Sequence, residues 1–503
     1  MARIAVIGAG MGAMAAAARL AVAGHRVTVY ERTSTYGGSV GRFERDGFVF
    51  DTGPGLLHLP AVWRDLFVKT GKEPLEKCVR LTQVDPASRH LFADGTDVLL
   101  PNASRAGTVS ALESALGPGA GERWGEFLGR ARDAWERSRR PLLEEPLPAD
   151  TSRFSKDPYP ALRQGLLRRP ARTLGEIGRR ELRDPRLAAL LDSHALAYGL
   201  DPRTAPASAS VLPYMEQTFG SWYVLGGLRA LADAVYERCL ARKVEFVFGT
   251  PVTRVLEKDG RVVGLERAGG EPVEADMVVS GAPVPSLFEG RAVGRNPVVG
   301  RDRPDGWPRQ DAVRTGRLTV HLALRGGRPE GTAHRTVVHA PDPLGEWDAI
   351  DAGKTGPRPT VIVMRPDDPL LRPDDDHETV TLTSTVPAEL LGKRSWADAA
   401  GAAADRMVEA ALAAVPELGE RMLWREVRTP EDTLGDTAAA VVPAPALAGA
   451  SGAFLPAPNA GPLSGMYLAG GWAHPGGGLA HAGMSGALVA GLIVEGSGFR
   501  GSR

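Results

Sequence analysis

The chain has 503 residues and is poor in cysteine, in lysine and in net charge. Its two cysteines, Cys78 and Cys239, lie far apart and lack the Cys/His spacing of a metal site. This excludes a structural zinc site, an iron–sulfur cluster and a disulfide framework, and predicts two unpaired thiols in a reducing cytoplasm. Basic and acidic residues number 60 each, so the net charge is zero. A nucleic-acid partner is not expected, because such proteins usually carry a basic excess.

A long uninterrupted hydrophobic run is also missing. The two uncharged stretches, Ile4–Ala18 and Met466–Val494, are interrupted by glycines, and the second also holds a proline and two histidines. Neither has the pattern of a membrane-spanning helix or a signal peptide. We therefore expect a cytoplasmic protein, and peripheral association with the inner face of the membrane is left open.

One arginine-rich region bears on that association. The stretch from Ser110 to about Leu200 has a helical pattern, and seven arginines crowd one part of it. Such a basic face is typical of lipid-facing helices. Interleaved acids favour instead an ordinary solvated helix face. The residues concerned are Arg163, Arg168, Arg169, Arg172, Arg179, Arg180 and Arg183, with Glu176, Glu181 and Asp184 between them.

What the chain does have is the pattern of a dinucleotide-binding βαβ unit at its amino terminus. An apolar strand, Arg3–Ile7, runs into a glycine turn, a strong helix former over Met14–Ala23 and a second strand, His25–Tyr30. In such a unit Gly8 permits the tight turn and Gly10 lets the backbone approach a pyrophosphate. The amino terminus of the helix then presents free N–H groups and a positive dipole to the phosphates.

Two further residues of this unit concern the ligand. Ala13 occupies the small-residue position where helix and strand touch. Glu31 follows the second strand and can accept both hydroxyls of an adenosine ribose. Because an acid at this position disfavours a 2′-phosphate, the sequence predicts FAD or NAD rather than NADP.

The motifs after Glu31 distinguish FAD from NAD. Gly37-Gly38 comes six residues later, and a run from Phe48 to Gly55 reads FVFDTGPG. This arrangement resembles the amine oxidase and phytoene desaturase superfamily of FAD enzymes. The resemblance implies that the glycine pair lies along the FAD diphosphate and that Gly53 and Pro54 pass near the flavin.

One departure concerns the phosphates. Carotenoid desaturases often have arginine or lysine where this chain has Ser39. Neutralisation of the phosphates would then depend on backbone N–H groups and on Arg42.

The resemblance continues in the middle of the chain. In Phe219–Ala234 an aromatic strand meets Gly226-Gly227 and a helix, as in the desaturases, and this segment is expected to close onto the flavin domain. A run of β-branched strands follows up to Ser280. The resemblance implies that the backbone of Val252 pairs with the adenine and that the Ala282-Pro283 turn follows the last strand near the cofactor.

The carboxyl-terminal landmark is Met466–Glu495. An apolar strand leads to Gly470-Gly471, a glycine-rich crossing and a small-residue helix from about Ala482. Such a helix can direct its amino terminus at the flavin N1–C2=O edge. The pattern AGGxxHPGxG resembles carotenoid desaturases, especially the hydroxyneurosporene-type 3,4-desaturases.

A second departure lies in this crossing. Those desaturases often have Pro-Met or Pro-Gly where this chain has Ala480-His481. His481 is therefore our candidate catalytic residue, as a base or as a group that positions the substrate, because neutral imidazole accepts a proton at neutral pH. The alternative is a histidine held by local backbone. The substitution also admits a substrate other than a standard long carotenoid, while His474 is expected to brace the crossing.

The candidate cofactor-binding residues all lie in these motifs. No metal ligand is expected in the chain. They are Gly8, Gly10, Met11, Gly12, Ala13, Glu31, Arg32, Gly37, Gly38, Ser39, Arg42, Gly53, Pro54, Gly55, Val252, Ala282, Gly470, Gly471, Leu479 and Ala480.

The expected fold class is α/β, with a Rossmann-like FAD domain of the glutathione reductase or p-hydroxybenzoate hydroxylase type and a substrate domain of mixed sheet and helices. The FAD domain is expected to be discontinuous, over 1–75, 220–295 and 415–503. The substrate domain would comprise 76–219 and 296–414, helical over about 106–215, with strand candidates such as Leu318–Leu324 and Thr379–Ser384.

The implied activity is bacterial, FAD-dependent desaturation of a C–C bond in an apolar polyene or isoprenoid of the carotenoid kind. Hydride would pass to flavin N5 and a proton would leave the neighbouring carbon. No second strand–glycine–helix unit is found, so dioxygen or a quinone is expected to reoxidise the flavin. The oligomeric state is left open.

Three other functions remain as alternatives. One is an FAD-dependent amine oxidase, or another flavin oxidase of a secondary metabolite. A flavin hydroxylase is disfavoured because its Asp-Gly and Gly-Asp markers are replaced by Ser280-Gly281 and Gly470-Gly471. A non-enzymatic lipid escort protein is disfavoured because a carrier need not keep a flavin site.

Overall fold

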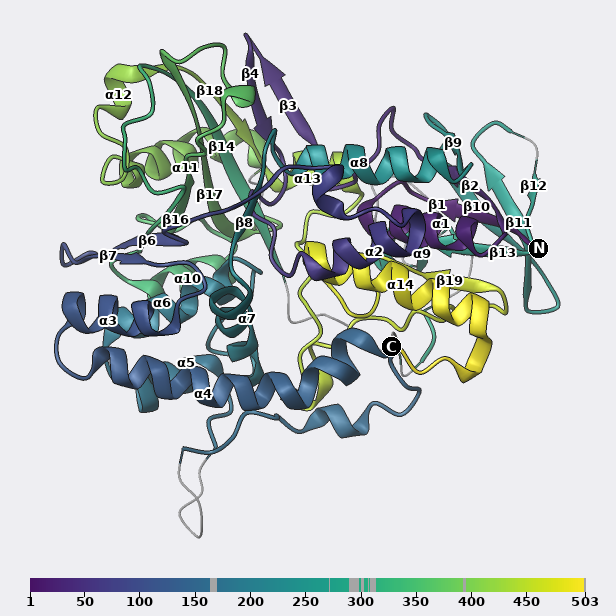
Figure 1. Cartoon of the computed structure of the whole chain (residues 1–503), viewed down its shortest axis with the longest axis horizontal. Helices are drawn as coiled ribbons and strands as arrows, with labels where there is room; N and C mark the ends of the chain where they lie inside the picture. Colours follow the sequence, from purple (N-terminus) through teal and green to yellow (C-terminus); the bar gives the residue numbers. More distant parts are fainter. Residues whose placement is uncertain are drawn as a thin grey trace.

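A computed structural model describes residues 1–162, 170–270, 272–288, 298–299, 303–305, 307, 314–391 and 395–501. Two large sheets organise this part of the chain. In Figure 1 the sheet that holds both the first and the last strand lies at the right, and the second sheet lies at the upper left above a group of helices.

The first sheet is five-stranded and parallel. Strand β1 (Arg3–Ile7) is central, between β13 (Met277–Ser280) and β2 (Arg26–Tyr30). The outer strands are β19 (Met466–Leu468) and β9 (Glu245–Val247). The sheet therefore joins the beginning, the middle and the end of the sequence, and the carboxyl ends of its parallel strands meet at one edge.

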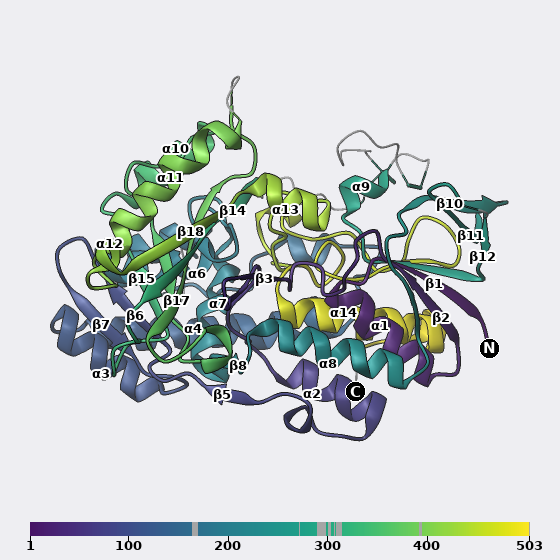
Figure 2. The same cartoon turned by 90° about the horizontal axis from the view of Figure 1, so that it is seen from above.

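Three helices pack together on this sheet. Helices α1 (Met11–Val22), α8 (Leu228–Ala241) and α14 (Leu479–Glu495) lie side by side, as Figure 2 shows, and α1 contacts both of the others. Both α1 and α14 begin three residues earlier than expected, at Met11 rather than Met14 and at Leu479 rather than Ala482. The reason is a glycine N-cap, Gly10 or Gly478, from which the chain turns directly into the helix.

The second sheet has seven strands in the order β18, β14, β17, β16, β15, β6, β7. Its strands are β18 (Met422–Arg428), β14 (Thr315–Arg325), β17 (His377–Pro387), β16 (Val361–Met364), β15 (Arg335–Val338), β6 (Ser88–Leu91) and β7 (Asp97–Leu100). The predicted strands of this region are thereby confirmed. One face of β14 and β17, with Leu318, Val320, Leu322, Val380 and Leu382, packs on Trp396 of α11 (Trp396–Ala411).

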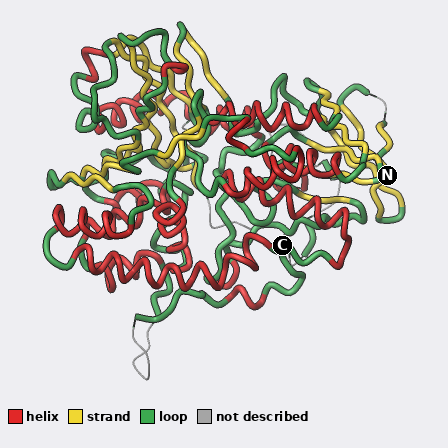
Figure 3. The backbone as a smooth tube through the Cα atoms, in the orientation of Figure 1, coloured by secondary structure: helices red, strands yellow, loops and turns green. Residues whose placement is uncertain are grey.

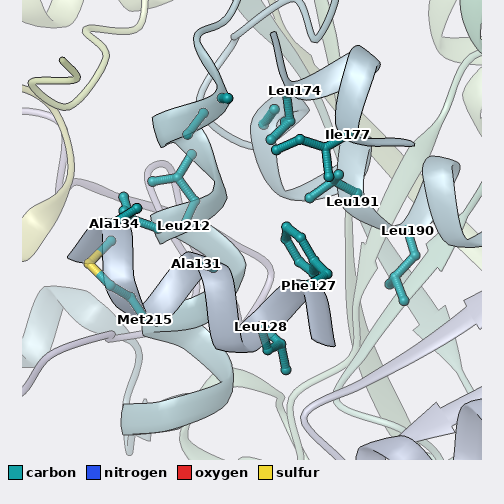
Figure 4. Close-up of a cluster of buried hydrophobic side chains, with 14 of the residues drawn as sticks. Phe127, Leu128, Ala131, Ala134, Leu174, Ile177, Leu190, Leu191, Leu212 and Met215 are labelled. Atoms are coloured by element: carbon teal, nitrogen blue, oxygen red, sulfur yellow. The ribbon is translucent and has the colours of Figure 1, made fainter. Parts of the chain in front are cut away.

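A helical group lies below this sheet in Figure 1. It comprises α3 (Arg105–Leu116), α4 (Ala120–Arg139), α5 (Leu174–Ile177), α6 (Pro185–Leu196) and α7 (Val211–Phe219). Its core gathers Phe127 and Leu128 of α4 with Leu190 and Leu191 of α6 and Leu212 and Met215 of α7, as Figure 4 shows. The helical pattern predicted for this part of the chain is therefore confirmed.

Smaller elements complete the structure, and Figure 3 shows how loops connect them. The strands are β3 (Arg42–Arg45) paired with β4 (Phe48–Asp51), β5 (Leu81–Gln83) paired with β8 (Trp222–Val224), and β10 (Val252–Lys258), β11 (Arg261–Arg267) and β12 (Val273–Glu274) in one sheet. The helices are α2 (Ala61–Gly71), α9 (Val284–Phe288), α10 (Pro343–Asp351), α12 (Leu418–Arg421) and α13 (Pro430–Thr437).

The α/β class and the Rossmann-like parallel sheet are confirmed. The division into 1–75, 220–295 and 415–503 against 76–219 and 296–414 stays a proposal. Strand β18, within 415–503, pairs with β14 of the larger sheet, so the chain returns to that sheet before its last strand.

Several expectations concern what the chain lacks. Cys78 and Cys239 are both free thiols. Within the described ranges, no group of three or more histidine, cysteine or acidic side chains is placed to hold a metal ion. No helix described here is both long and apolar enough to cross a membrane. Arg163, Arg168 and Arg169 of the arginine-rich region lie outside the described residues.

Candidate functional site

A cavity of about 1890 Å³ lies between the two sheets. At one end it is lined by the residues that follow β1, β2, β13 and β19, and at the other by β14, β16 and β17. Ligands of parallel α/β sheets bind at this carboxyl edge. The volume exceeds the roughly 300–1,000 Å³ of an ordinary small-molecule site. The cavity therefore has room for a dinucleotide and a second molecule.

The glycine turn after β1 forms one wall of the cavity. Gly8 has a positive φ of 88°, and its N–H donates to the carbonyl of Tyr30 over 2.8 Å. A Cβ added to Gly10 would meet no atom within 4 Å, so Gly10 faces open space. The N–H of Gly37 donates to the carbonyl of Ala9 over 2.8 Å, which brings the second glycine pair against the first turn.

Glu31 is held at the end of β2 with only 9% of its surface exposed. Its Oε2 accepts the N–H of Ala9 over 2.7 Å, and its Oε1 accepts the N–H of Thr33 over 2.8 Å and the Thr33 hydroxyl over 2.9 Å. Because a carboxylate has about four acceptor sites, it can still accept hydrogen bonds from a ligand in the cavity.

Two helix amino termini open into the same cavity. Gly10 and Gly478 are the N-caps of α1 and α14, and neither helix has a side-chain cap. Their first N–H groups therefore stay available for an anion or a polar edge. A Cβ on Gly12 would lie 2.6 Å from the Cα of Gly470, so glycine at position 12 is what lets the two ends of the chain meet.

All twenty candidate cofactor-binding residues, together with His481, line this cavity. The cavity thus brings together segments that lie far apart in the sequence, at positions 8–13, 31–55, 252, 282 and 470–481. Arg42, on β3, has its Nη1 3.2 Å from Oε1 of Glu44.

Arg229 was missed at the sequence level. It lies in the first turn of α8, and its guanidinium lies 4.2 Å from the ring centroid of Tyr36. It donates to the Tyr36 carbonyl over 2.7 Å and to Asp233 over 2.8 Å, beside Gly37. Its only sequence signal is its place just after Gly226-Gly227.

Asp51 is the second missed residue. Its carboxylate accepts the N–H groups of Leu228 over 2.7 Å and of Arg229 over 3.2 Å at the amino terminus of α8. Burial raises the pKa of Asp51 to about 6, while these N–H groups and Arg42 oppose the rise. The acid of the Asp-x-Gly-Pro motif thus caps a helix of the middle segment.

His481 lies buried in the first turn of α14. Its Nδ1 is close to Gly478, since a Cβ added to that glycine would lie 3.1 Å from it. Burial lowers the pKa of His481 to about 4. Within the described chain the imidazole makes no hydrogen bond, so the structure shows no backbone group that holds it. His474 differs, because its Nε2 lies 2.9 Å from the carbonyl oxygen of Glu145 and its own carbonyl accepts from Asn459 over 2.7 Å.

The far end of the cavity carries many polar and charged side chains beside apolar ones, which the sequence did not indicate. Arg335 forms a partly buried ion pair with Glu216, and this pair lowers the pKa of Glu216 although desolvation opposes the shift. His58, His90 and His194 lie near it. Other polar side chains at this end come from the seven-stranded sheet and from the loop after α6, among them Tyr198, Arg317, Thr319, Thr379, Thr381, Thr383 and Thr385.

Comparison with known proteins bears on this geometry. The model of the "Flavin containing amine oxidoreductase" family matches residues 14–301. A zeta-carotene-forming phytoene desaturase of Myxococcus xanthus is 30% identical over 72% of this chain and 68% of its own. The chain belongs to the phytoene desaturase-like group of the flavin-containing amine oxidoreductases.

Other similar proteins agree with this assignment. A 4,4'-diapolycopene oxygenase of Methylomonas is 29% identical over 72% of this chain and 71% of its own. The structure of putrescine oxidase bound to putrescine shares the fold, with a TM-score of 0.62 at 15% identity over 98% of this chain and 99% of that one. The phytoene desaturase-like chain is thus an FAD-dependent oxidoreductase.

The residues present fit FAD. The open space beside Gly10, the two uncapped helix amino termini and the carboxylate of Glu31 at the end of β2 provide what a phosphate-bearing dinucleotide requires.

Proposed function

We propose that this phytoene desaturase-like enzyme desaturates C–C bonds of an apolar, polyene-like isoprenoid. The observation that supports it is that one continuous cavity of about 1890 Å³ connects the glycine turn after β1 with the floor of the seven-stranded sheet. An extended molecule bound along that floor would bring one of its carbons to the amino terminus of α14. The desaturase and oxygenase relatives support the choice of substrate class.

FAD, when bound, accepts the hydride at flavin N5. We propose that Glu31 accepts the ribose hydroxyls and that Gly10 and Gly37-Gly38 lie along the diphosphate. Arg42 and Arg229 would supply the positive charge that Ser39 does not. The first N–H groups of α14 would stabilise negative charge that develops nearby during reduction.

His481 is proposed to face the reacting part of the substrate. Because burial lowers its pKa to about 4, the imidazole is neutral near pH 7 and can accept a proton or a hydrogen bond. An allylic C–H next to a polyene needs no strong base, since delocalisation stabilises the cationic character. Orientation and exclusion of water then carry most of the catalysis.

The amine oxidase alternative receives less support from the cavity. An ammonium group would need a free carboxylate or an aromatic cage. Glu216 is bound to Arg335, and Asp51 caps α8. The likeness to putrescine oxidase concerns the fold alone.

The test is spectroscopic. The purified protein is expected to be yellow and to bleach under anaerobic conditions with a polyene but not with amines. The product should be two hydrogens lighter by mass spectrometry. Bleaching by amines alone would contradict the proposal, and a colourless protein unable to take up FAD would point to an escort protein.

We also propose cytoplasmic localisation with peripheral association with the inner face of the membrane, because a polyene substrate partitions into lipid. The exposed Arg172, Arg179 and Arg180 would take part, although Arg180 pairs with Glu176 at 3.1 Å. Flotation with anionic vesicles tests this, and absence of binding at low salt would contradict it.

A further inference from the structure

The floor of the cavity is unexpectedly polar for a hydrocarbon substrate. Strands β14 and β17 alternate, so the residues that pack on α11 are apolar while the opposite face lines the cavity. That face carries Arg317 and Thr319 on β14 and Thr379, Thr381, Thr383 and Thr385 on β17. Buried polar groups cost free energy unless they are hydrogen-bonded, and a hydrocarbon offers them no partner.

Some of these groups have no internal partner. Thr319 lies opposite Thr383 in the β14–β17 register, and neither hydroxyl makes a hydrogen bond to another described residue. The same holds for the hydroxyl of Tyr198, in the loop after α6. Burial raises the pKa of Tyr198 to about 12, so the hydroxyl keeps its proton and can donate a hydrogen bond to a ligand.

Arg317 is the charged member of this floor. Its guanidinium donates to the carbonyl of Ala197, and no carboxylate within the described ranges lies at ion-pair distance from it. Burial lowers the pKa of Arg317, yet an arginine stays protonated in proteins. A half-buried positive charge without a counter-charge is costly.

Counting charges near Tyr198 shows one unbalanced cation. Its hydroxyl lies close enough to Arg317, Arg335 and Glu216 for their charges to act on its pKa. Arg335 and Glu216 neutralise each other. The nearby His194 is neutral at pH 7, because burial lowers its pKa. The wall therefore has a net charge of about +1.

We propose that the substrate carries a carboxylate that Arg317 and Tyr198 bind, on an otherwise apolar unsaturated chain. This rests on the desaturase function proposed above and narrows its substrate class. A carboxylate balances one positive charge and accepts from both a guanidinium and a hydroxyl. A phosphate ester would bring almost two negative charges against one, and the structure offers it no second free cation at this wall within the described residues.

The position of the carboxylate follows from Tyr198. A Cβ on Gly478 would lie 3.5 Å from Cε1 of Tyr198 and 3.1 Å from Nδ1 of His481, so the three residues are adjacent. The acidic end of the substrate would therefore bind beside the amino terminus of α14. The apolar chain would then extend along the apolar lining residues of the cavity, such as Leu212, Met215 and Ile362.

The experiment uses the FAD-loaded protein and four probes of equal chain length: a polyene monocarboxylic acid, its methyl ester, the parent hydrocarbon and the monophosphate. Dissociation constants are measured by quenching of tryptophan fluorescence. We expect the acid to bind about 10- to 100-fold more tightly than the ester, as for a charge-assisted hydrogen bond. Equal binding of acid and ester, or tighter binding of the phosphate than of the acid, would overturn the proposal.

Variants locate the effect. Arg317→Met should remove the preference for the acid and leave binding of the ester unchanged, Arg317→Lys should keep part of the preference, and Tyr198→Phe should reduce it. Arg123→Met is the matched control, because Arg123 also donates to a carbonyl, that of Leu182 over 2.8 Å, but lies outside the cavity. A preference for the acid that survives Arg317→Met would contradict the assignment. Flavin content, read from the visible spectrum, shows whether each variant is folded.

Turnover separates this inference from the proposed function. If the acid binds through Arg317 but no probe bleaches the flavin, desaturation is wrong while the carboxylate site stands. If the hydrocarbon and the ester are desaturated as efficiently as the acid, the function stands and the carboxylate site is wrong.

Discussion

Glu31 has two roles. It accepts hydrogen bonds from backbone N–H groups of its own chain, and it is proposed to bind the ribose. The acid after the second strand predicted the nucleotide unit from sequence. The contact of its carboxylate with Ala9 became visible only in the structure. That contact explains why the side chain is already oriented before any ligand arrives.

Replacing Glu31 by Ala should weaken FAD binding about 10- to 100-fold, since charge-assisted hydrogen bonds to the ribose are lost. The ratio of flavin to protein absorbance after gel filtration measures this. Glu245→Ala is the control, an exposed carboxylate of β9 that lies outside the cavity. Unchanged flavin content in Glu31→Ala would contradict the proposed ribose site.

His481→Ala should lower kcat by about 100-fold while flavin content is unchanged, the size of effect expected when an acid–base group is lost. In the folded enzyme the pKa of His481 is lowered to about 4, so the imidazole stays neutral and active as pH falls from 7.5 to 5.5. The plot of kcat/KM against pH should therefore show no break near 6.5 that depends on this residue. Undiminished turnover, or a break near 6.5 that the substitution abolishes, would refute the role.

At the scale of elements, the wall of the cavity depends on the contact between α1 and the glycine-rich crossing before α14. The two glycine N-caps were partly predictable, because glycine turns stood out in the sequence. The helix starts were misplaced by three residues, since no local signal shows where a glycine turn becomes helical. Only the backbone positions of Gly12 and Gly470 show how closely the two segments approach.

Gly12→Ala should destabilise the protein by about 1–3 kcal/mol and reduce flavin content, because the new Cβ would lie 2.6 Å from backbone of Gly470. Urea unfolding followed by circular dichroism measures the change. Gly401→Ala in α11 is the matched control, as a Cβ there meets nothing within 4 Å. Alanine should stabilise that helix by about 0.5–1 kcal/mol. Wild-type stability and flavin content in Gly12→Ala would contradict the close packing.

A buried ion pair stabilises the larger sheet. Glu378 on β17, 1% exposed, accepts from Arg365 over 2.7 and 2.9 Å and from Arg421 over 2.8 Å. Glu378→Gln leaves the buried guanidinium of Arg365 and the partly buried one of Arg421 without a counter-charge, so the free energy of unfolding should fall by about 3–5 kcal/mol. Denaturant unfolding tests this, with Glu330→Gln, an exposed loop residue, expected to change it by less than about 0.5 kcal/mol. Equal stabilities would show that the ion pair contributes little.

At the scale of the whole molecule, the cavity is built from both ends of the chain and from its middle. A ligand that fills it should therefore stabilise the entire structure. FAD at about 100 times its dissociation constant should raise the free energy of unfolding by about 2.7 kcal/mol. Thermal melts of the FAD-free protein with added FAD measure this. A melting temperature that does not depend on FAD would contradict the shared cavity.

The sequence by itself determined the nucleotide-binding unit, the family and the cofactor, because those depend on local motifs: a glycine turn, an acid after a strand, a glycine crossing before a helix. It also predicted several strands of the second sheet, among them Leu318–Leu324 and Thr379–Ser384. Tertiary structure alone decided which side chains face the cavity. Arg317, Tyr198 and the threonines of β17 are unremarkable in sequence. They become a site only because strand alternation and the register of β14 with β17 turn them toward the same space.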